Sequence, residues 1–320
     1  MNAAVVESFD APPRYTSFAE PVAGEGEMIV NVSATGLHQI VRLLARGTHY
    51  GSTGVLPMIP GVDGVGRLSD GTRVYFGISR SPYGTFAERT VTARSMCWPA
   101  PEALDDVSIA GMTNPGMSSW AALTSRAQFK RGESVLILGA TGTSGQLAVQ
   151  IARRLGARRV VAAGRNPEKL ERVKALGADA VISLNQEHGA LVASFRRELA
   201  SDRIDVVLDY LWGSPAESLL EAISQKGLQH AASRIRFVQV GSTAGPTISL
   251  SAATLRSSGL ELIGSGFGSV SMEKIRKSVA EFHAEAAKAP FQTNIKAVSL
   301  RDVEALWNSP EQGARLVFQP

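Results

Sequence analysis

The sequence predicts a two-domain α/β protein, in which a β-rich N-terminal part precedes a doubly wound parallel sheet. In the first part, short apolar segments such as Met28–Val32, Arg73–Phe76 and Phe86–Val91 are separated by Gly, Pro and Ser turns. From about Asp105 the pattern becomes helical, and from Glu133 strands and helices alternate. The 320 residues, 44% of them hydrophobic, are enough for two cores.

The alternating part contains the strands of the predicted parallel sheet. Six apolar segments fit a six-stranded doubly wound sheet: Ser134–Leu138, Val160–Ala163, Ala180–Ile182, Val206–Leu208, Phe237–Val240 and Leu260–Ile263. An amphipathic helix is expected over Met272–Lys288. The final segment, Arg315–Phe318, is too small to fold alone, so we expect it to return to the N-terminal β-rich part.

The most informative stretch is the turn after the first of these strands. Glycines at 139, 142 and 145 would permit a tight turn, a close approach of backbone to a pyrophosphate and tight packing of the following helix. Three glycines can also occur in an ordinary strand-turn-helix, but the helical spacing of Leu147, Ile151 and Leu155 and the second strand favour a dinucleotide site. The predicted cofactor residues here are Gly139, Ala140, Thr141, Gly142, Thr143, Ser144 and Gly145.

The tip of the second strand indicates which dinucleotide binds. A site for NAD usually places Asp or Glu there, whereas this chain continues Gly164, Arg165, Asn166, and then Lys169 one helical turn later. Arg165 can offer a planar fork to a 2′-phosphate and Lys169 a point charge, which favours NADPH. The alternative is a pair of solvated basic residues at a helix start.

Ligands of such sheets bind outside the carboxyl ends of the parallel strands. Gly241 and Ser242, after the fifth strand, and Gly264, Ser265 and Gly266, after the sixth, are therefore expected near the nicotinamide half of the cofactor.

Composition excludes several partners. The net charge of +4 comes without a block of Lys or Arg, so we expect no nucleic-acid or membrane partner. The single cysteine, Cys97, excludes an internal disulfide and is expected to be an inert buried thiol. The N-terminus lacks the basic start and apolar core of a signal peptide, so a cytoplasmic protein is expected.

The chain resembles the medium-chain dehydrogenase/reductases, and within them the zinc-independent quinone oxidoreductase-like branch. The resemblance covers nearly the whole length and rests on the order of the glycine turn and four earlier segments: Ala34–Thr35–Gly36–Leu37–His38, Leu56–Gly66, Asp70–Val74 and Tyr83–Glu88. It implies a GroES-like β domain of residues 1–115 with 272–320, and an inserted Rossmann domain of residues 116–271. It also implies an oligomer formed by joining Rossmann sheets edge to edge, and we expect a homodimer.

The resemblance also bears on zinc and on the reaction. Asp63 and its neighbours occupy the place of the Gly-His-Glu segment of zinc alcohol dehydrogenases, and the five histidines, His230 among them, show no close pair with a third ligand nearby, so no metal is expected. Without a Lewis acid, a quinone or an activated C=C bond of an enone or enoyl group is an easier hydride acceptor than a simple carbonyl.

The chain departs from the branch where the substrate donors are expected. His38 stands where quinone reductases have Asn, and Val41, Leu43 and Ala45 replace their Asp, Tyr and Arg, so quinone and enone acceptors both stay open. His38, Arg42 and Tyr50 are the candidate catalytic residues, as possible donors to an oxyanion. His49, Asn114 and Trp120 are expected to line the substrate cleft. For all of these except Asn114, a purely structural role is the alternative.

Other classes fit less well. After Gly145 the chain lacks the Lys and Ser/Thr of a P-loop, and no tyrosine, Tyr210 included, is followed four residues later by the lysine of a short-chain dehydrogenase. A non-catalytic NADPH-binding redox sensor or structural protein of the same fold stays open as an alternative to the enzyme.

Overall fold

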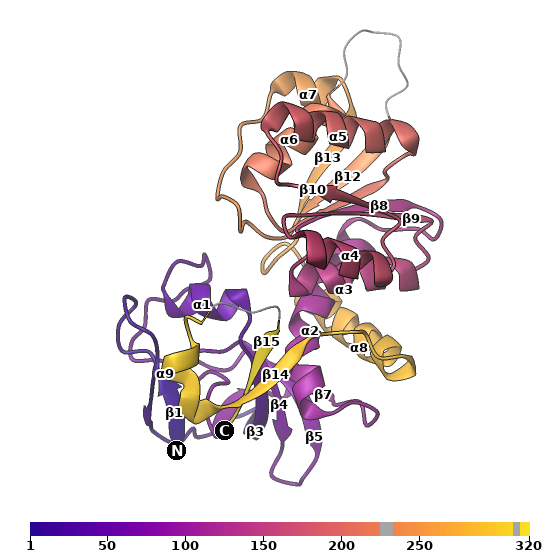
Figure 1. The fold of residues 1–320 in the computed structure, drawn as a ribbon. Helices are drawn as coiled ribbons and strands as arrows, with labels where there is room; N and C mark the ends of the chain where they lie inside the picture. The colour runs from indigo at the N-terminus through magenta and orange to yellow at the C-terminus, as the bar shows by residue number, and fades with distance from the viewer. Residues whose placement is uncertain (225–232, 310–313) are drawn as a thin grey trace. The chain divides into compact units, whose positions relative to one another are not determined.

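The computed structural model describes residues 1–224, 233–309 and 314–320 and divides the chain into two compact units (Figure 1). Unit 1 comprises Met1–Pro115 and Val279–Pro320, and unit 2 comprises Gly116–Ser278. Each connection lies within a helix, namely α2 (Asp106–Ala121) and α8 (Met272–Lys288). The boundaries expected from sequence are 115/116 and 271/272; the second lies at the start of α8, seven residues before the division at 278/279.

Unit 2 is a doubly wound α/β domain. Its described residues form a parallel six-stranded sheet of order β10-β9-β8-β11-β12-β13, which confirms the fold class predicted for this part. The strands are β8 (Ser134–Leu138), β9 (Arg159–Gly164), β10 (Ala180–Ser183), β11 (Val206–Asp209), β12 (Arg234–Gln239) and β13 (Gly259–Gly264). The helical segments are the π-helical turn η2 (Ala122–Arg126), α3 (Thr143–Arg154), α4 (Pro167–Ala175), α5 (His188–Ser201), α6 (Gly213–Ile223) and α7 (Ala252–Arg256).

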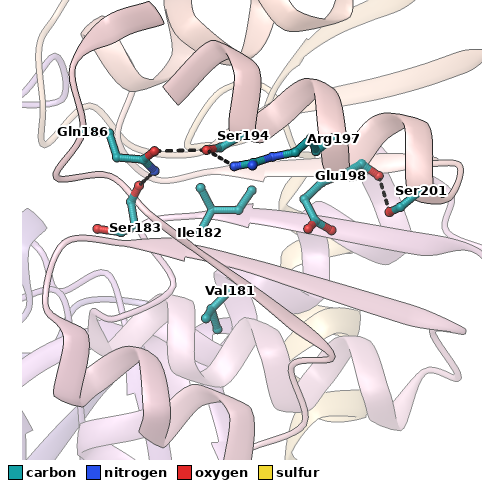
Figure 2. A pocket seen from close by; sticks show the side chains of 8 residues that line it. All are labelled: Val181, Ile182, Ser183, Gln186, Ser194, Arg197, Glu198 and Ser201. Carbon is teal, nitrogen blue, oxygen red and sulfur yellow. Dashed lines mark hydrogen bonds between the residues drawn. The ribbon is translucent and has the colours of Figure 1, made fainter. Parts of the chain in front are cut away.

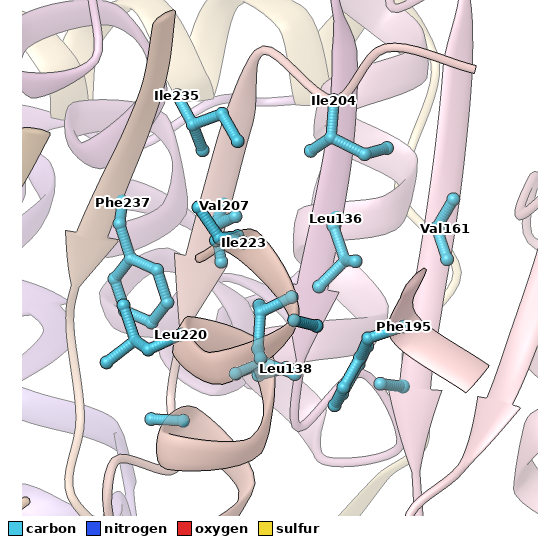
Figure 3. Close-up of a cluster of buried hydrophobic side chains, with 14 of the residues drawn as sticks. Leu136, Leu138, Val161, Phe195, Ile204, Val207, Leu220, Ile223, Ile235 and Phe237 are labelled. Atoms are coloured by element: carbon cyan, nitrogen blue, oxygen red, sulfur yellow. The ribbon is translucent and has the colours of Figure 1, made fainter. Parts of the chain in front are cut away.

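Helices cover both faces of this sheet (Figure 1). Because side chains alternate along a strand, Leu136 and Leu138 face the α5 and α6 side and pack with Phe195, Leu220 and Phe237 (Figure 3). These side chains are almost completely buried, and burying each one stabilises the fold by about 1.5–3 kcal/mol. A rigid sheet therefore fixes the positions of the turns at its carboxyl end.

Unit 1 is built from both ends of the chain. Its larger sheet has the order β14-β15-β3-β4-β5-β7, with β6 paired to β3, and β1 and β2 form a separate antiparallel pair among the described residues. The elements are β1 (Asn2–Val5), β2 (Arg14–Ser17), β3 (Glu27–Gly36), α1 (Gln39–Ala45), β4 (Asp63–Arg67), β5 (Arg73–Gly77), β6 (Arg89–Ala93), η1 (Arg94–Met96), β7 (Cys97–Pro99), β14 (Ile295–Ser299), η3 (Leu300–Asp302), α9 (Val303–Leu306) and β15 (Arg315–Gln319).

The core of unit 1 confirms the expected return of the tail. Strand β15 pairs antiparallel with β3, and Phe318 and Trp307 pack around Phe86 with ring centroids 5.4 and 5.7 Å away. The C-terminal segment thus completes a core that the first hundred residues begin.

One strand expected in unit 1 is shorter than the sequence suggests. The apolar run Phe86–Val91 predicts a strand from residue 86, but β6 begins at Arg89. The preceding residues bind β1 instead, because Ala4 N donates to Phe86 O and Glu88 N donates to Asn2 O. No helix in the described ranges is long and apolar enough to cross a membrane.

Candidate cofactor and catalytic site

The glycine turn lies directly between β8 and α3. Gly139 adopts φ +84°, a left-handed conformation that only glycine adopts easily, and Gly142 N donates to Gly139 O at 3.2 Å. A Cβ at Gly145 would overlap Gly139 O and lie 2.5 Å from Ala140 Cα, so the third glycine permits close packing of the helix on the strand. A Cβ at Gly142 would meet nothing nearer than Gly139 O at 3.7 Å, so the second glycine has no such packing role.

The start of α3 is suited to bind an anion. Gly142 is the N-cap and supplies no side-chain hydrogen bond, and the first turn carries no acidic residue. The amide N–H groups of the first helical turn have no intrahelical acceptor, and the positive end of the helix dipole lies there. Gln146 Nε2 donates to Thr141 O at 2.9 Å and holds the turn in place. Together these features fit a pyrophosphate on the residues predicted from sequence, Thr143 and Ser144 included.

The tip of β9 lies next to this turn. Thr141 covers Gly164, because a Cβ at Gly164 would lie 2.9 Å from Thr141 Oγ1. Asn166 caps α4 by accepting from Lys169 N at 2.9 Å. The side chain of Arg165 is exposed, and among the described residues neither Arg165 nor Lys169 forms an ion pair.

The carboxyl ends of β12 and β13 are also close together. Ser265 N donates to Gln239 O at 2.8 Å, and Gly241 N donates to Asp209 O at 3.1 Å. Ser242, Gly264 and Gly266 are at least partly exposed at this edge. The fold thus brings the expected glycine and serine segments to the carboxyl edge that holds the glycine turn.

Sequence reasoning missed the segment that follows β11. The carboxylate of Asp209 is fully buried and accepts from Leu211 N (2.8 Å) and Trp212 N (3.0 Å), while burial raises its pKa to about 6. Trp212 has φ +57° and ψ −158°, a region populated almost only by glycine. The rule that ligands bind at carboxyl ends of strands could have drawn attention to this segment.

In unit 1, the candidate residue His38 is buried beside a carboxylate. Its Nε2 lies 3.5 Å from Asp63 Oδ1, and the side chains are 4% and 3% exposed. Tyr75 OH donates to Asp63 Oδ2 at 2.9 Å, and burial together with the Asp63 charge raises the pKa of Tyr75, which keeps it protonated. Gly36 leaves room for the ring, since a Cβ there would lie 2.5 Å from His38 Nε2.

Neither ring nitrogen of His38 has a hydrogen-bond partner in the described part of the chain. A buried polar atom without a partner costs about 1–3 kcal/mol, so such a group needs an explanation in function or in bound water. The 3.5 Å approach of Nε2 to Asp63 Oδ1 is thus the side-chain contact that bears on the role of His38.

The other two candidate catalytic residues lie in different surroundings. Arg42 Nε donates to Trp307 O at 3.1 Å, which ties α1 to the C-terminal segment. Tyr50 is 72% exposed and lies against the His49 ring, with centroids 4.1 Å apart. His49 Nδ1 accepts from Gly51 N at 3.0 Å, and burial lowers the pKa of His49. None of these contacts involves His38, so they do not assemble the three candidates as one group.

The two candidate cleft residues on α2 fall in different units. Asn114 is half-buried in unit 1, and Trp120 is 5% exposed in unit 2. Pro115 lies between them within the same helix. Cys97, expected as an inert buried thiol, is half-buried, and burial raises the pKa of its thiol.

A cavity of about 410 Å³ lies elsewhere in unit 2, between β10 and α5 (Figure 2). Arg197 donates to Ser194, which donates to Gln186, each at 3.0 Å, so its polar groups already bind one another. None of the predicted site residues lines it; the lining is Val181, Ile182, Ser183, Gln186, Ser194, Arg197, Glu198 and Ser201.

No three His, Cys, Asp or Glu side chains come together in a metal-binding arrangement within the described ranges; His230 lies outside them. The His38 and Asp63 pair supplies at most two ligands. Structural zinc sites use four protein ligands and catalytic ones three.

Comparison with known proteins agrees with this geometry. Residues 145–285 match the family model described as zinc-binding dehydrogenase. The whole chain is 30% identical to the whole of a probable NADPH-dependent quinone reductase, tdiC, of Emericella nidulans. The chain belongs to the medium-chain dehydrogenase/reductase superfamily, in its quinone oxidoreductase-like branch.

Other members of the superfamily are also similar to this chain. A chloroplastic NADPH-dependent alkenal/one oxidoreductase of Arabidopsis thaliana is 28% identical over 59% of this chain and 51% of its own. The quinone oxidoreductase of Thermus thermophilus, solved also with NADPH, aligns over 100% of both chains with a TM-score of 0.82 and 26% identity. The GroES-like and Rossmann architecture expected from sequence is thereby confirmed.

Proposed function

We propose that this protein is a zinc-independent, NADPH-dependent reductase that transfers hydride to a quinone or to the activated C=C bond of an enone or enoyl compound. The observation that carries the proposal is the glycine turn, whose uncapped α3 start lies next to the exposed Arg165. The superfamily members named above are reductases that use NADPH and act on quinones or alkenals.

The residues of unit 2 would bind and orient the cofactor. The amides of the first α3 turn would hold the pyrophosphate, and Arg165 and Lys169 the 2′-phosphate. Gly241, Ser242 and the Gly264–Gly266 segment would flank the nicotinamide half. When bound, NADPH supplies the hydride.

On the acceptor side, negative charge develops on an oxygen of the enolate or quinol, and hydrogen-bond donors stabilise it. His38 is the candidate donor in unit 1, because its ring nitrogens have no partner among the described residues and Asp63 lies beside it. Since both nitrogens are buried, acceptor binding requires a shift of neighbouring side chains. Arg42 and Tyr50, with His49, Asn114 and Trp120, stay proposals as catalytic and substrate-lining residues.

Zinc independence is supported by the donor set. The place of the Gly-His-Glu segment holds Asp63, and the carboxylate already accepts a hydrogen bond from Tyr75. A protein with one cysteine in 320 residues suits a reducing compartment, so a cytoplasmic location belongs to the same proposal.

A homodimer is part of this proposal. In the described sheet, β13 pairs only with β12 and leaves its outer edge open. Leu262 and Phe267 are 39% and 37% exposed at or just after this strand. An open edge with exposed apolar side chains is suited to pair with the same edge of a second copy.

The test is anaerobic oxidation of NADPH, with NADH in parallel, against matched quinones, linear and cyclic enones and simple aldehydes, with products identified by mass. Hydroquinone or saturated ketone formed preferentially with NADPH is the expected result, and it chooses between the two acceptor classes. Reduction of aldehydes alone would contradict the acceptor assignment. Tight NADPH binding without any turnover would favour the non-catalytic redox sensor, which the reductases among the relatives make the weaker alternative.

A further inference from the structure

Tyr210, the first residue after β11, contacts two predicted cofactor segments through its backbone and Cβ. Its N donates to Leu138 O at 3.2 Å, at the start of the glycine turn. A Cβ on Gly139 would lie 3.3 Å from Tyr210 Cβ, and one on Gly241 would lie 2.9 Å from Tyr210 O. Tyr210 O also accepts from Thr243 Oγ1 at 3.0 Å. The residue is therefore packed between the glycine turn and the segment after β12.

The hydroxyl of Tyr210 reaches a third segment. It lies 2.8 Å from Ser119 Oγ in the second half of α2, and Ser119 Oγ donates to Ser144 O, in the first turn of α3, at 3.4 Å. Either hydroxyl can be the donor in the bond between Tyr210 and Ser119. Burial raises the pKa of Tyr210 well above its usual value, so the hydroxyl keeps its hydrogen at physiological pH.

The order of the strands decides which half of the cofactor these contacts concern. Strand β9, with Arg165 at its tip, lies on one side of β8, and β11, β12 and β13 lie on the other. If the pyrophosphate sits at α3 and the 2′-phosphate at Arg165, the nicotinamide half extends toward β11 and β12. Tyr210 and Ser119 link α2, α3 and the segment after β12 on that side.

We propose that the hydroxyl pair of Tyr210 and Ser119 positions the residues that bind the nicotinamide half of the cofactor. The inference rests on the proposed function, since it needs a nicotinamide cofactor at the glycine turn. It assigns to both hydroxyls a positioning role rather than contact with the reacting atoms.

The experiment measures the Kd of NADPH, of NADH and of 2′,5′-ADP, which lacks the nicotinamide half. In Tyr210→Phe only the hydroxyl is lost, and we expect the Kd of both NADPH and NADH to rise about 3- to 10-fold, the effect of one hydrogen bond. The Kd of 2′,5′-ADP should stay unchanged. Ser119→Ala should give the same pattern with at least as large a rise, because its bond to Ser144 O is lost as well. Adding Tyr210→Phe to Ser119→Ala should change nothing further, because the hydrogen bond that the two hydroxyls share is already gone.

Thr124→Val is the matched control. Thr124 Oγ1 donates to Trp120 O at 2.8 Å in the adjoining π-helical turn, so the variant loses a hydroxyl close to Ser119 without touching Tyr210. It should leave all three Kd values unchanged. Unchanged NADPH binding in Tyr210→Phe would overturn the inference, and so would an equal loss for 2′,5′-ADP, because the pair would then support the turn as a whole. A wild-type protein that bound neither dinucleotide would instead overturn the proposed function itself.

Discussion

At the scale of single residues, Arg165 is the residue proposed to select NADPH over NADH. Its side chain is exposed and forms no ion pair in the described part of the chain. We expect Arg165→Ala to weaken NADPH binding about tenfold or more, because a charge-assisted hydrogen bond contributes about 1.5–3 kcal/mol. NADH binding should be nearly unchanged. Fluorescence titration with each cofactor gives the ratio of the Kd of NADPH to the Kd of NADH. Equal losses would show that the 2′-phosphate lies elsewhere.

Trp212 is held in a conformation that suits glycine. Replacing it by Ala or by Gly removes the ring in both cases, including its contact with Phe237 at 6.3 Å. The two variants then differ in backbone strain, and we expect Trp212→Gly to be more stable than Trp212→Ala by about 1–2 kcal/mol. Urea unfolding of the two variants measures the difference. An Ala variant at least as stable as the Gly variant would show that the turn carries no strain.

At the scale of elements, the second and third glycines of the turn have separable roles. Gly142→Ala places a Cβ in open space, so the thermal midpoint should stay unchanged while NADPH binding weakens at least about tenfold through loss of the close phosphate approach. Gly145→Ala forces a Cβ into the backbone of Gly139 and Ala140, so its thermal midpoint should fall. Calorimetry with and without NADPH measures the thermal midpoint and the effect of the cofactor on it, and so distinguishes a loss of packing from a loss of binding. An unchanged Kd of NADPH in Gly142→Ala would show that the pyrophosphate does not bind at this turn.

Helix α8 contributes a pH-dependent contact to unit 1. His283 Nε2 lies 2.9 Å from Thr113 Oγ1, its ring lies against Tyr75, and burial lowers the pKa of His283 to about 4. As the pH falls below 6.5, the unfolded chain binds the proton first, so the free energy of unfolding falls until about pH 4. The loss is roughly 3 kcal/mol, from about 1.36 kcal/mol per pKa unit.

His283→Gln keeps an N–H donor for Thr113 but cannot become charged, so it serves as the control. The wild type should lose more stability than this variant between about pH 7.5 and about pH 4.5 in urea unfolding. If the free energy of unfolding changed equally with pH in the two proteins, His283 would not bind a proton on unfolding.

At the scale of the whole molecule, the edge of β13 is the proposed dimer interface. We expect light scattering to give twice the mass of one chain for the wild type and one chain mass for Leu262→Lys, since a charge on an edge strand opposes pairing. Leu255→Lys is the control, because Leu255 is 45% exposed on α7 rather than on the strand. A dimeric Leu262→Lys would place the interface elsewhere.

The sequence predicts the parts of this molecule that depend on local patterns. The β8, turn and α3 unit follows from an apolar strand, glycine spacing and helical periodicity, and all of these lie within about twenty residues. The return of Arg315–Phe318 to the N-terminal part follows from size alone, because so short an apolar segment cannot bury itself.

The rest depends on contacts between distant segments. Tyr210 and Ser119 are 91 residues apart, and Tyr75 and Asp63 meet only across the paired strands β4 and β5. Trp212 has a positive φ, which its residue type does not predict, and its N–H donates to the buried Asp209 carboxylate. The sequence therefore predicted the strand, turn and helix of the proposed cofactor site, and it pointed to His38 without its neighbour Asp63.

The pairing of β15 with β3 also bears on how the chain folds as it is made. Unit 2 is continuous, so all of it is synthesised before the residues that complete unit 1. Until then β3 lacks its partner strand, and Phe86 lacks both Trp307 and Phe318. Residues 1–100 are thus made before unit 2 but complete their core after it, and during that interval their apolar surface is what chaperones would recognise.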